Sequence, residues 1–206
     1  MINVVVVEDQ AMVRGAISSL LSLEDEFTVV GQAENGEVAL SLINELINSK
    51  QQRVDLVLSD IEMPTMSGLE LAETIQSSYS NIKVVIMTTF SKSGYIKRAL
   101  KLGVKGFILK EAPIEDLVSA LKKVSDGAKV INPELALMAL DDNDPLSEKE
   151  RKAIKLAGEG LKTSEIAQKL FLSEGTVRNY LSEAISKLNA TNRIEAARIA
   201  KQKGWI

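Results

Sequence analysis

The sequence predicts an α/β fold over residues 1–127 and a small all-α domain over residues 145–206. Apolar runs alternate with helical periodicity five times in the first region, which is typical of a doubly wound parallel sheet with helices on both faces. From Asp144 onward the apolar spacing is helical throughout. Residues 1–138 contain 13 Lys and Arg against 18 Asp and Glu, whereas residues 146–206 contain 12 against 7. We therefore expect two domains that have different partners.

The five expected strands are runs of Val, Ile, Leu and Met with few polar breaks, as in strands buried on both faces. They cover residues 3–7, 27–32, 54–59, 83–87 and 105–109. The helices that follow them are expected at residues 10–23, 33–49, 68–79, 95–102 and 113–125, where apolar residues recur at helical spacing. Gly103 and Gly127 suit helix ends, and Pro113 suits a first turn. A flavodoxin-like strand order 2-1-3-4-5 would place the switch point between the first and third strands.

Composition excludes several classes of chemistry. The chain has no Cys, which rules out disulfides and thiolate zinc sites, and no His, which rules out Ser-His catalysis and a phosphohistidine donor within this chain. No G-x-G-x-x-G follows the first strand, so a dinucleotide is not expected. No window approaches 18 uncharged apolar residues, and the N-terminus runs into acids, unlike a signal peptide. We expect a cytoplasmic protein without membrane insertion.

Polar side chains follow four of the expected strands. Glu8 and Asp9 follow the first strand, and Asp60 follows the third. Thr88 and Lys110 follow the fourth and fifth strands. Parallel strands end at one edge of the sheet, where open α/β folds bind ligands, so we expect these five groups to converge. Three converging carboxylates repel one another, and either a divalent cation or a proton must relieve that repulsion. Among cations, oxygen ligands favour Mg²⁺ (or Mn²⁺).

Asp60 could then act as a carboxylate nucleophile that accepts a phosphoryl group. Lys110 and the Thr88 hydroxyl could each hold one phosphoryl oxygen, the first by charge and the second by a hydrogen bond. The metal would neutralise charge on the transferred oxygens. Each residue alone has a simpler interpretation, because a single Asp after a strand often caps the next turn. The set of five favours phosphoryl transfer.

The tracts VVEDQ, LSDIEMPTMSGLE, VVIMTTF and KGFILK resemble the receiver domain of bacterial two-component response regulators, over residues 1–127. The resemblance implies that Asp60 is the phosphoacceptor and that Glu8 and Asp9 lie on the metal side. It also implies that the backbone carbonyl of Glu62 is a metal ligand. The family often has Asp where this chain has Glu8, whose longer side chain could still reach the metal through water.

The same resemblance implies roles in signalling for three further residues. Thr88 would be the switch hydroxyl, Phe107 the aromatic residue that reorients with it, and Lys110 the phosphate-binding lysine. Phe107 could instead be a packed strand residue. No enzymatic activity is expected beyond the Mg²⁺-dependent phosphotransfer and dephosphorylation that a receiver could catalyse on itself.

The basic C-terminal region predicts a helix-turn-helix. Ser147 and Glu150 form a capping-box pattern that opens one helix, Thr163 should cap the next, and Ser173 should cap a third after a three-residue turn. The third helix would bury Val177, Leu181, Ile185 and Leu188. Residues of types that contact phosphates and base edges lie on its opposite face and at the preceding helix start. These DNA-binding candidates are Lys162, Thr163, Thr176, Arg178, Asn179, Ser182 and Lys187.

Residues 145–206 resemble the LuxR-type four-helix DNA-binding domain, so the whole chain resembles a NarL/FixJ-class regulator, with residues 128–144 as the linker. Tyr180 stands where that family commonly has His. The tracts EDQ, IEMP, TTFSKSGY, GTVRNY and NRIEA–KGW look most like DesR-type membrane-lipid regulators of Gram-positive bacteria. We expect a sensor histidine kinase to phosphorylate Asp60, a homodimer to form, and two recognition helices to bind paired half-sites in double-stranded promoter DNA.

Two other interpretations remain open. The chain could be a phosphorylation-independent DNA-binding regulator with a vestigial receiver. An aspartyl-phosphate phosphohydrolase would instead be expected to have a D-x-D pair after the first strand, where this chain has Glu8–Asp9–Gln10.

The surface through which the dimer would form is also left open by the sequence. The dimer could use the first and fifth helices, or the fourth helix, fifth strand and fifth helix. Apolar candidates on the first and fifth helices are Met12, Ile17, Leu117 and Leu121.

Overall fold

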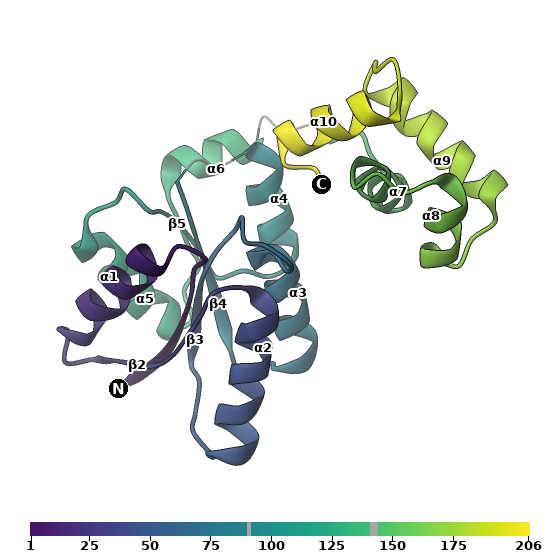
Figure 1. Ribbon diagram of the computed structural model, residues 1–206. Coiled ribbons are helices and arrows are strands. Elements are labelled where there is room, and N and C mark those ends of the chain that lie inside the picture. The colour runs from purple at the N-terminus through teal and green to yellow at the C-terminus, as the bar shows by residue number, and fades with distance from the viewer. Residues whose placement is uncertain (90–91, 141–143) are drawn as a thin grey trace. The chain divides into compact units, whose positions relative to one another are not determined.

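The computed structural model describes residues 1–89, 92–140 and 144–206 (Figure 1). Two compact units are present, one made of residues 1–91 and 96–137 and the other of residues 92–95 and 138–206. None of the helices in the described ranges combines the length and the apolar composition that crossing a bilayer requires.

The first unit is a parallel sheet covered by helices on both faces. Its strand order is β2-β1-β3-β4-β5-β6, so the predicted order is confirmed and one strand is added. The strands are β1 (Ile2–Val7), β2 (Phe27–Ala33), β3 (Leu56–Asp60), β4 (Lys83–Thr88), β5 (Gly106–Leu109) and β6 (Val130–Ile131). The helices are α1 (Ala11–Ser22), α2 (Gly36–Asn44), α3 (Gly68–Ser78), α4 (Ser93–Lys101), α5 (Ile114–Ser125) and α6 (Pro133–Leu140). A short π-helical segment, η1 (Glu45–Ser49), continues α2.

The central strands are uninterrupted apolar runs in the sequence. This pattern is expected because helices cover both of their faces. Residues 4–7 of β1 and residues 56–58 of β3 are fully buried. On one face, Val4 and Val6 pack with Leu58 and with Leu121 of α5 in one core cluster. Helices α1 and α5 cover this face, and α2, α3 and α4 cover the other (Figure 1). The strand ends are thereby held in register at one edge of the sheet.

The structure differs from the sequence prediction in residues 128–144. Strand β6 pairs with β5, joining Gly106 to Val130 and Phe107 to Ile131, and helix α6 follows it. Asn132 precedes α6 and accepts a hydrogen bond from the Glu134 backbone N–H at 2.9 Å. A two-residue strand is too short to show periodicity, so the sequence predicted only a linker here. Residues 141–143 of that linker lie outside the described residues.

The second unit contains four helices around its own core. They are α7 (Glu148–Gly158), α8 (Thr163–Leu170), α9 (Glu174–Lys187) and α10 (Arg193–Lys203). Of the predicted core face of α9, three residues are buried and Ile185 is half-buried, while the buried Ala184 was not predicted. Trp205 also joins this core.

The helix caps of this unit are mostly as predicted. The Ser147 side chain accepts from the Glu150 N–H at 3.3 Å, and the Glu150 carboxylate accepts from the Ser147 N–H at 2.8 Å. The Ser173 hydroxyl accepts from the Thr176 N–H at 3.1 Å. The predicted cap at Thr163 is wrong, because Lys162 is the N-cap and Thr163 is the first helical residue of α8. The side chain of Glu165 reaches back to the Lys162 N–H at 2.6 Å and satisfies it.

The start of α3 fixes the loop that follows β3. The Gly68 N–H donates to the Ile61 carbonyl at 2.9 Å, and Ser59 Oγ donates to the Asp60 carbonyl at 2.8 Å. A Cβ on Gly68 would lie 1.9 Å from the Asp60 carbonyl oxygen. Only glycine therefore allows the helix to approach the end of β3 this closely.

We expect Gly68→Ala to destabilise the first unit by about 1–3 kcal/mol, because a methyl group is forced against rigid backbone. Gly15→Ala is the matched control, since Gly15 lies inside α1 with no atom within 4 Å of its Cβ position. The control should stabilise the unit by about 0.5–1 kcal/mol through helix propensity. Thermal unfolding followed by circular dichroism measures both effects. Equal behaviour of the two variants would contradict the tight contact at Gly68.

Candidate functional site

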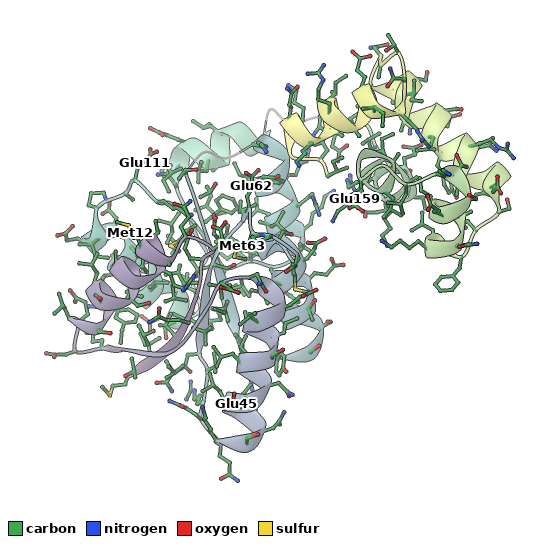
Figure 2. The ribbon with its side chains drawn as sticks, in the orientation of Figure 1. Met12, Glu45, Glu62, Met63, Glu111 and Glu159 are labelled. Atoms are coloured by element: carbon green, nitrogen blue, oxygen red, sulfur yellow. The ribbon has the colours of Figure 1, made fainter. Side chains whose placement is uncertain are left out.

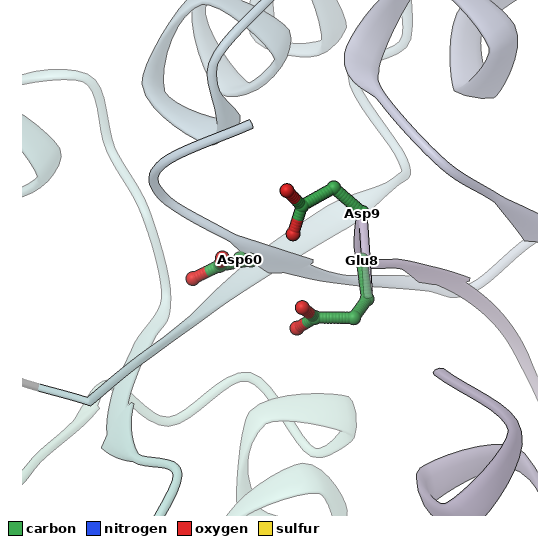
Figure 3. Close-up of side chains that lie close together, drawn as sticks. All are labelled: Glu8, Asp9 and Asp60. Carbon is green, nitrogen blue, oxygen red and sulfur yellow. The ribbon is translucent and has the colours of Figure 1, made fainter. Parts of the chain in front are cut away.

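Three carboxylates meet at the carboxyl edge of the sheet (Figure 3). Glu8 and Asp9 directly follow β1, and Asp60 is the last residue of β3, one residue later than the predicted strand end. One oxygen from each lies within 4.8 Å of the others. Glu8 and Asp60 are buried, whereas Asp9 is exposed. The cluster is therefore open to solvent on the Asp9 side.

Lys110, which follows β5, links two of these carboxylates. Its Nζ lies 2.7 Å from Glu8 Oε2 and 3.0 Å from Asp60 Oδ2, and its side chain is 11% exposed. The Lys110 N–H donates to the Thr88 carbonyl at 2.8 Å, so the ends of β4 and β5 are joined beside the site. Thr88 is buried at the end of β4. The structure thus brings all five predicted edge residues to one place.

Burial dominates the electrostatics of the cluster. It raises the pKa of Glu8, and the Lys110 hydrogen bond only partly offsets this effect. Burial likewise raises the pKa of Asp60, with Lys110 opposing it and the Asp9 charge adding to it. Burial alone would lower the pKa of Lys110, but hydrogen bonds to Glu8 and Asp60 outweigh it and raise this pKa. One cation therefore compensates the acids incompletely.

The donor set fits a hard divalent cation. All candidate ligands are oxygens, and the carboxylates carry more negative charge than Lys110 neutralises. Glu8 Oε2 already faces Lys110, and Asp60 Oδ1 accepts from the Ile61 N–H at 2.7 Å. Asp9 is the exposed carboxylate of the three. Glu62, whose carbonyl was predicted as a ligand, lies two residues beyond Asp60 in the β3–α3 loop, and its side chain is exposed (Figure 2).

Two residues near Asp60 were not predicted from the sequence. Gly68 and Ser59 both contact the Asp60 backbone, and their roles depend on loop geometry rather than on a motif.

Phe107, the predicted switch aromatic, is 1% exposed within β5 and pairs with Ile86 of β4. In this conformation it is a packed strand residue.

The predicted DNA-binding residues lie on α8 and α9. Arg178, Asn179 and Ser182 are exposed on α9, and Lys162 is exposed at the start of α8. Thr163 and Thr176 are half-buried. The Thr176 hydroxyl lies 2.8 Å from the Ser173 hydroxyl, so it also supports the helix start.

Lys187 has a different partner from the one expected. Its Nζ lies 2.8 and 2.9 Å from the two carboxylate oxygens of Glu150, a residue that is 6% exposed. This ion pair joins the last turn of α9 to the first turn of α7. Lys187 therefore stabilises the fold of the unit, and its contact with DNA stays a prediction.

Asp60→Asn should raise the thermal unfolding midpoint of the first unit at pH 7. The folded-state pKa of Asp60 lies above its ordinary value of 3.8, so the ionised carboxylate costs stability once it is charged. The advantage of Asn should therefore be full at neutral pH and shrink as the pH falls toward 3.8. Asp25→Asn, on the exposed turn after α1, is the control and should have little effect. A loss of stability in Asp60→Asn would contradict the uncompensated charge.

Lys187→Met should destabilise the second unit by about 1–3 kcal/mol at pH 7, because a buried carboxylate loses its cation. Burial by itself raises the pKa of Glu150, but hydrogen bonds from Lys187 and Ser147 outweigh it and leave this pKa below 4.5. The stabilisation is thus present above pH 4.5 and is lost as the pH falls through the lowered pKa. Unfolding at several pH values measures the difference from wild type. Lys201→Met, on the exposed end of α10, is the control, and a pH-independent difference would refute the assignment.

Comparison with known proteins identifies both units. Residues 4–122 match the response regulator receiver domain, and residues 144–200 match the bacterial regulatory proteins of the luxR family. The transcriptional regulatory proteins YvfU and DesR of Bacillus subtilis (strain 168) are 47% and 42% identical over 206 residues, with 100% of each chain covered. The two-component response regulator RcsB in its DNA complex is 25% identical, with a TM-score of 0.64 and 98% of each chain covered. The chain belongs to the NarL class of response regulators, in which a receiver domain is followed by a LuxR-type DNA-binding domain.

Proposed function

We propose that this transcriptional regulator is switched by phosphorylation of Asp60. The observation that carries the proposal is the position of Lys110, whose ammonium lies 3.0 Å from Asp60 within a cluster of three carboxylates. Asp60 ends a buried strand and is 7% exposed, so a phosphoryl group on it would lie beside Lys110 and Thr88. Since the chain has no His, the donor is another molecule, and a sensor histidine kinase is the proposed partner.

In the transfer, an Asp60 carboxylate oxygen forms a bond to phosphorus as the phosphorus–nitrogen bond of the kinase histidine breaks. Lys110 then exchanges Asp60 Oδ2 for a phosphoryl oxygen, and the Thr88 hydroxyl donates to a second one. Mg²⁺ (or Mn²⁺), held by Glu8, Asp9, Asp60 and the Glu62 carbonyl, would neutralise the charge on the transferred oxygens. Phe107 would follow Thr88, which lies on the neighbouring strand.

Phosphorylation is proposed to favour a homodimer, and the exposed face of α1 supports this step. Met12, Leu20 and Leu23 are 90%, 40% and 78% exposed, and the first two lie about two helical turns apart on one side of α1. The apolar residues of α5 considered for the same surface are not available, because Leu117 and Leu121 are buried in the core. Ile17 is half-buried. The apolar part of an α1–α5 interface would therefore come from α1.

The dimer would present two α9 helices to paired half-sites in double-stranded DNA. The candidates for base-edge and phosphate contacts on α9 are the exposed Arg178, Asn179 and Ser182 and the half-buried Thr176. Lys162 and Thr163, at the start of α8, are the candidates for a backbone phosphate. A single small basic domain binds weakly and with strong salt dependence. Linking two of them makes the second binding event intramolecular, which is how phosphorylation would raise affinity.

Incubation with acetyl phosphate and Mg²⁺ tests the proposal. Wild type should gain the mass of one phosphoryl group and bind its DNA about 10-fold or more tightly, because two modules then act together. Asp60→Ala should gain no mass and show no change in DNA affinity. Lys110→Ala should gain less mass than wild type and show a smaller change in DNA affinity. Intact-mass spectrometry and fluorescence anisotropy with a duplex selected from a random pool by wild-type protein supply the two readings.

Asp25→Ala is the matched control for the loss of an acid and should behave as wild type. Wild type that gains no mass would favour a phosphorylation-independent regulator with a vestigial receiver. Rapid gain and loss of mass without any change in DNA affinity would favour a phosphohydrolase.

A further inference from the structure

Phe171 occupies the turn between α8 and α9 in an unusual way. It is the C-cap residue of α8, with φ 55° and ψ 45°, in the left-handed region. Its side chain is 94% exposed. The neighbouring Leu170 and Leu172 pack against the core of the unit, so the ring alone is turned outward.

Neither property stabilises the isolated domain. A left-handed backbone disfavours residues that carry a Cβ, and the chain places glycine at comparable positions such as Gly103 and Gly204, with φ 74° and 71°. An exposed aromatic ring gains nothing from burial. Phe171 therefore contributes neither a favoured turn nor core packing, and a function outside the free domain would account for it.

We infer that Phe171 is a DNA-contacting residue at the rim of the major groove, and this inference rests on the proposed binding of DNA by α9. A recognition helix contacts base edges with its N-terminal residues, so the turn that leads into it lies beside the groove. Phe171 stands two residues before Ser173, the N-cap of α9. The ring is already exposed, so contact requires no rearrangement of the domain.

The chemistry of this turn suits nucleic acid. Residues 166–173 contain the exposed Lys169 and no acid, and the exposed Glu165 and Glu174 flank the segment, so the turn itself is positively charged. An apolar ring can pack on a thymine methyl group or on the deoxyribose at the groove edge. Such a contact releases no counterion, so its loss should weaken binding without changing the salt dependence.

Phe171→Asn in the full-length chain separates this function from a structural role. Asn tolerates the left-handed conformation, and no packed side chain is lost, so the unfolding midpoint of the second unit should rise. Affinity for the duplex selected by wild-type protein should fall about tenfold, the size of one lost base-edge contact, with an unchanged salt slope. Phe171→Leu, which keeps an apolar side chain and the strained backbone, should keep part of the affinity and none of the stability gain.

Asn189→Gly is the matched control, because Asn189 is also left-handed, with φ 49°, and exposed, but follows the far end of α9. It should leave DNA affinity unchanged. Affinity of Phe171→Asn within twofold of wild type would overturn the inference. The inference would also be overturned if Phe171→Asn shifted the phosphorylated protein from dimer toward monomer in the absence of DNA. The Phe171 ring would then contribute to the dimer interface. Arg178→Ala identifies a wider failure: if it too leaves affinity unchanged, the proposed recognition face of α9 is wrong.

Discussion

The candidate site depends on one ammonium group, which two buried carboxylates share. Lys110 lies 2.7 Å from Glu8 and 3.0 Å from Asp60, while Asp9 adds a third negative charge at the exposed side. Removing this cation would leave buried acids that repel one another without compensation. Even with it, the pKa values of Glu8 and Asp60 are raised by burial. The resting site therefore retains an unfavourable charge, which the proposed divalent cation would relieve on binding.

The sheet makes this arrangement possible, because its strands cannot move independently. Residues 4–7 and 56–58 are buried on both faces, so the ends of β1 and β3 are fixed relative to each other. Gly68 brings α3 against the Asp60 carbonyl and fixes the loop beyond it. Lys110 reaches the cluster from β5, whose end is tied to Thr88 on β4. The backbone hydrogen bond between Lys110 and Thr88 therefore places Thr88 next to any group that Lys110 would bind.

The edge site could be predicted from the sequence because parallel topology alone brings strand ends together. Glu8, Asp60 and Lys110 are separated by tens of residues, yet each directly follows or ends a strand. Contacts that depend on three-dimensional packing could not be predicted in this way. Lys187 has the residue type and spacing of a DNA contact, but Glu150, on another helix, takes its charge. The burial of Leu117 and Leu121 likewise depends on packing, because an apolar helix face can serve either a core or a dimer surface.

Asp60 and Phe171, the two residues for which we propose functions, carry their unfavourable features in different forms. At Asp60 the cost is electrostatic and buried, so bulk salt screens it weakly and a bound cation or phosphoryl group acts on it directly. At Phe171 the cost is conformational and apolar, so neither salt nor phosphorylation changes it within the free domain. The cost at Asp60 involves its neighbours Lys110 and Asp9, and the cost at Phe171 is confined to one exposed residue. Either could therefore be removed by a single substitution without unfolding its domain, which is the behaviour expected of residues kept for function rather than for stability.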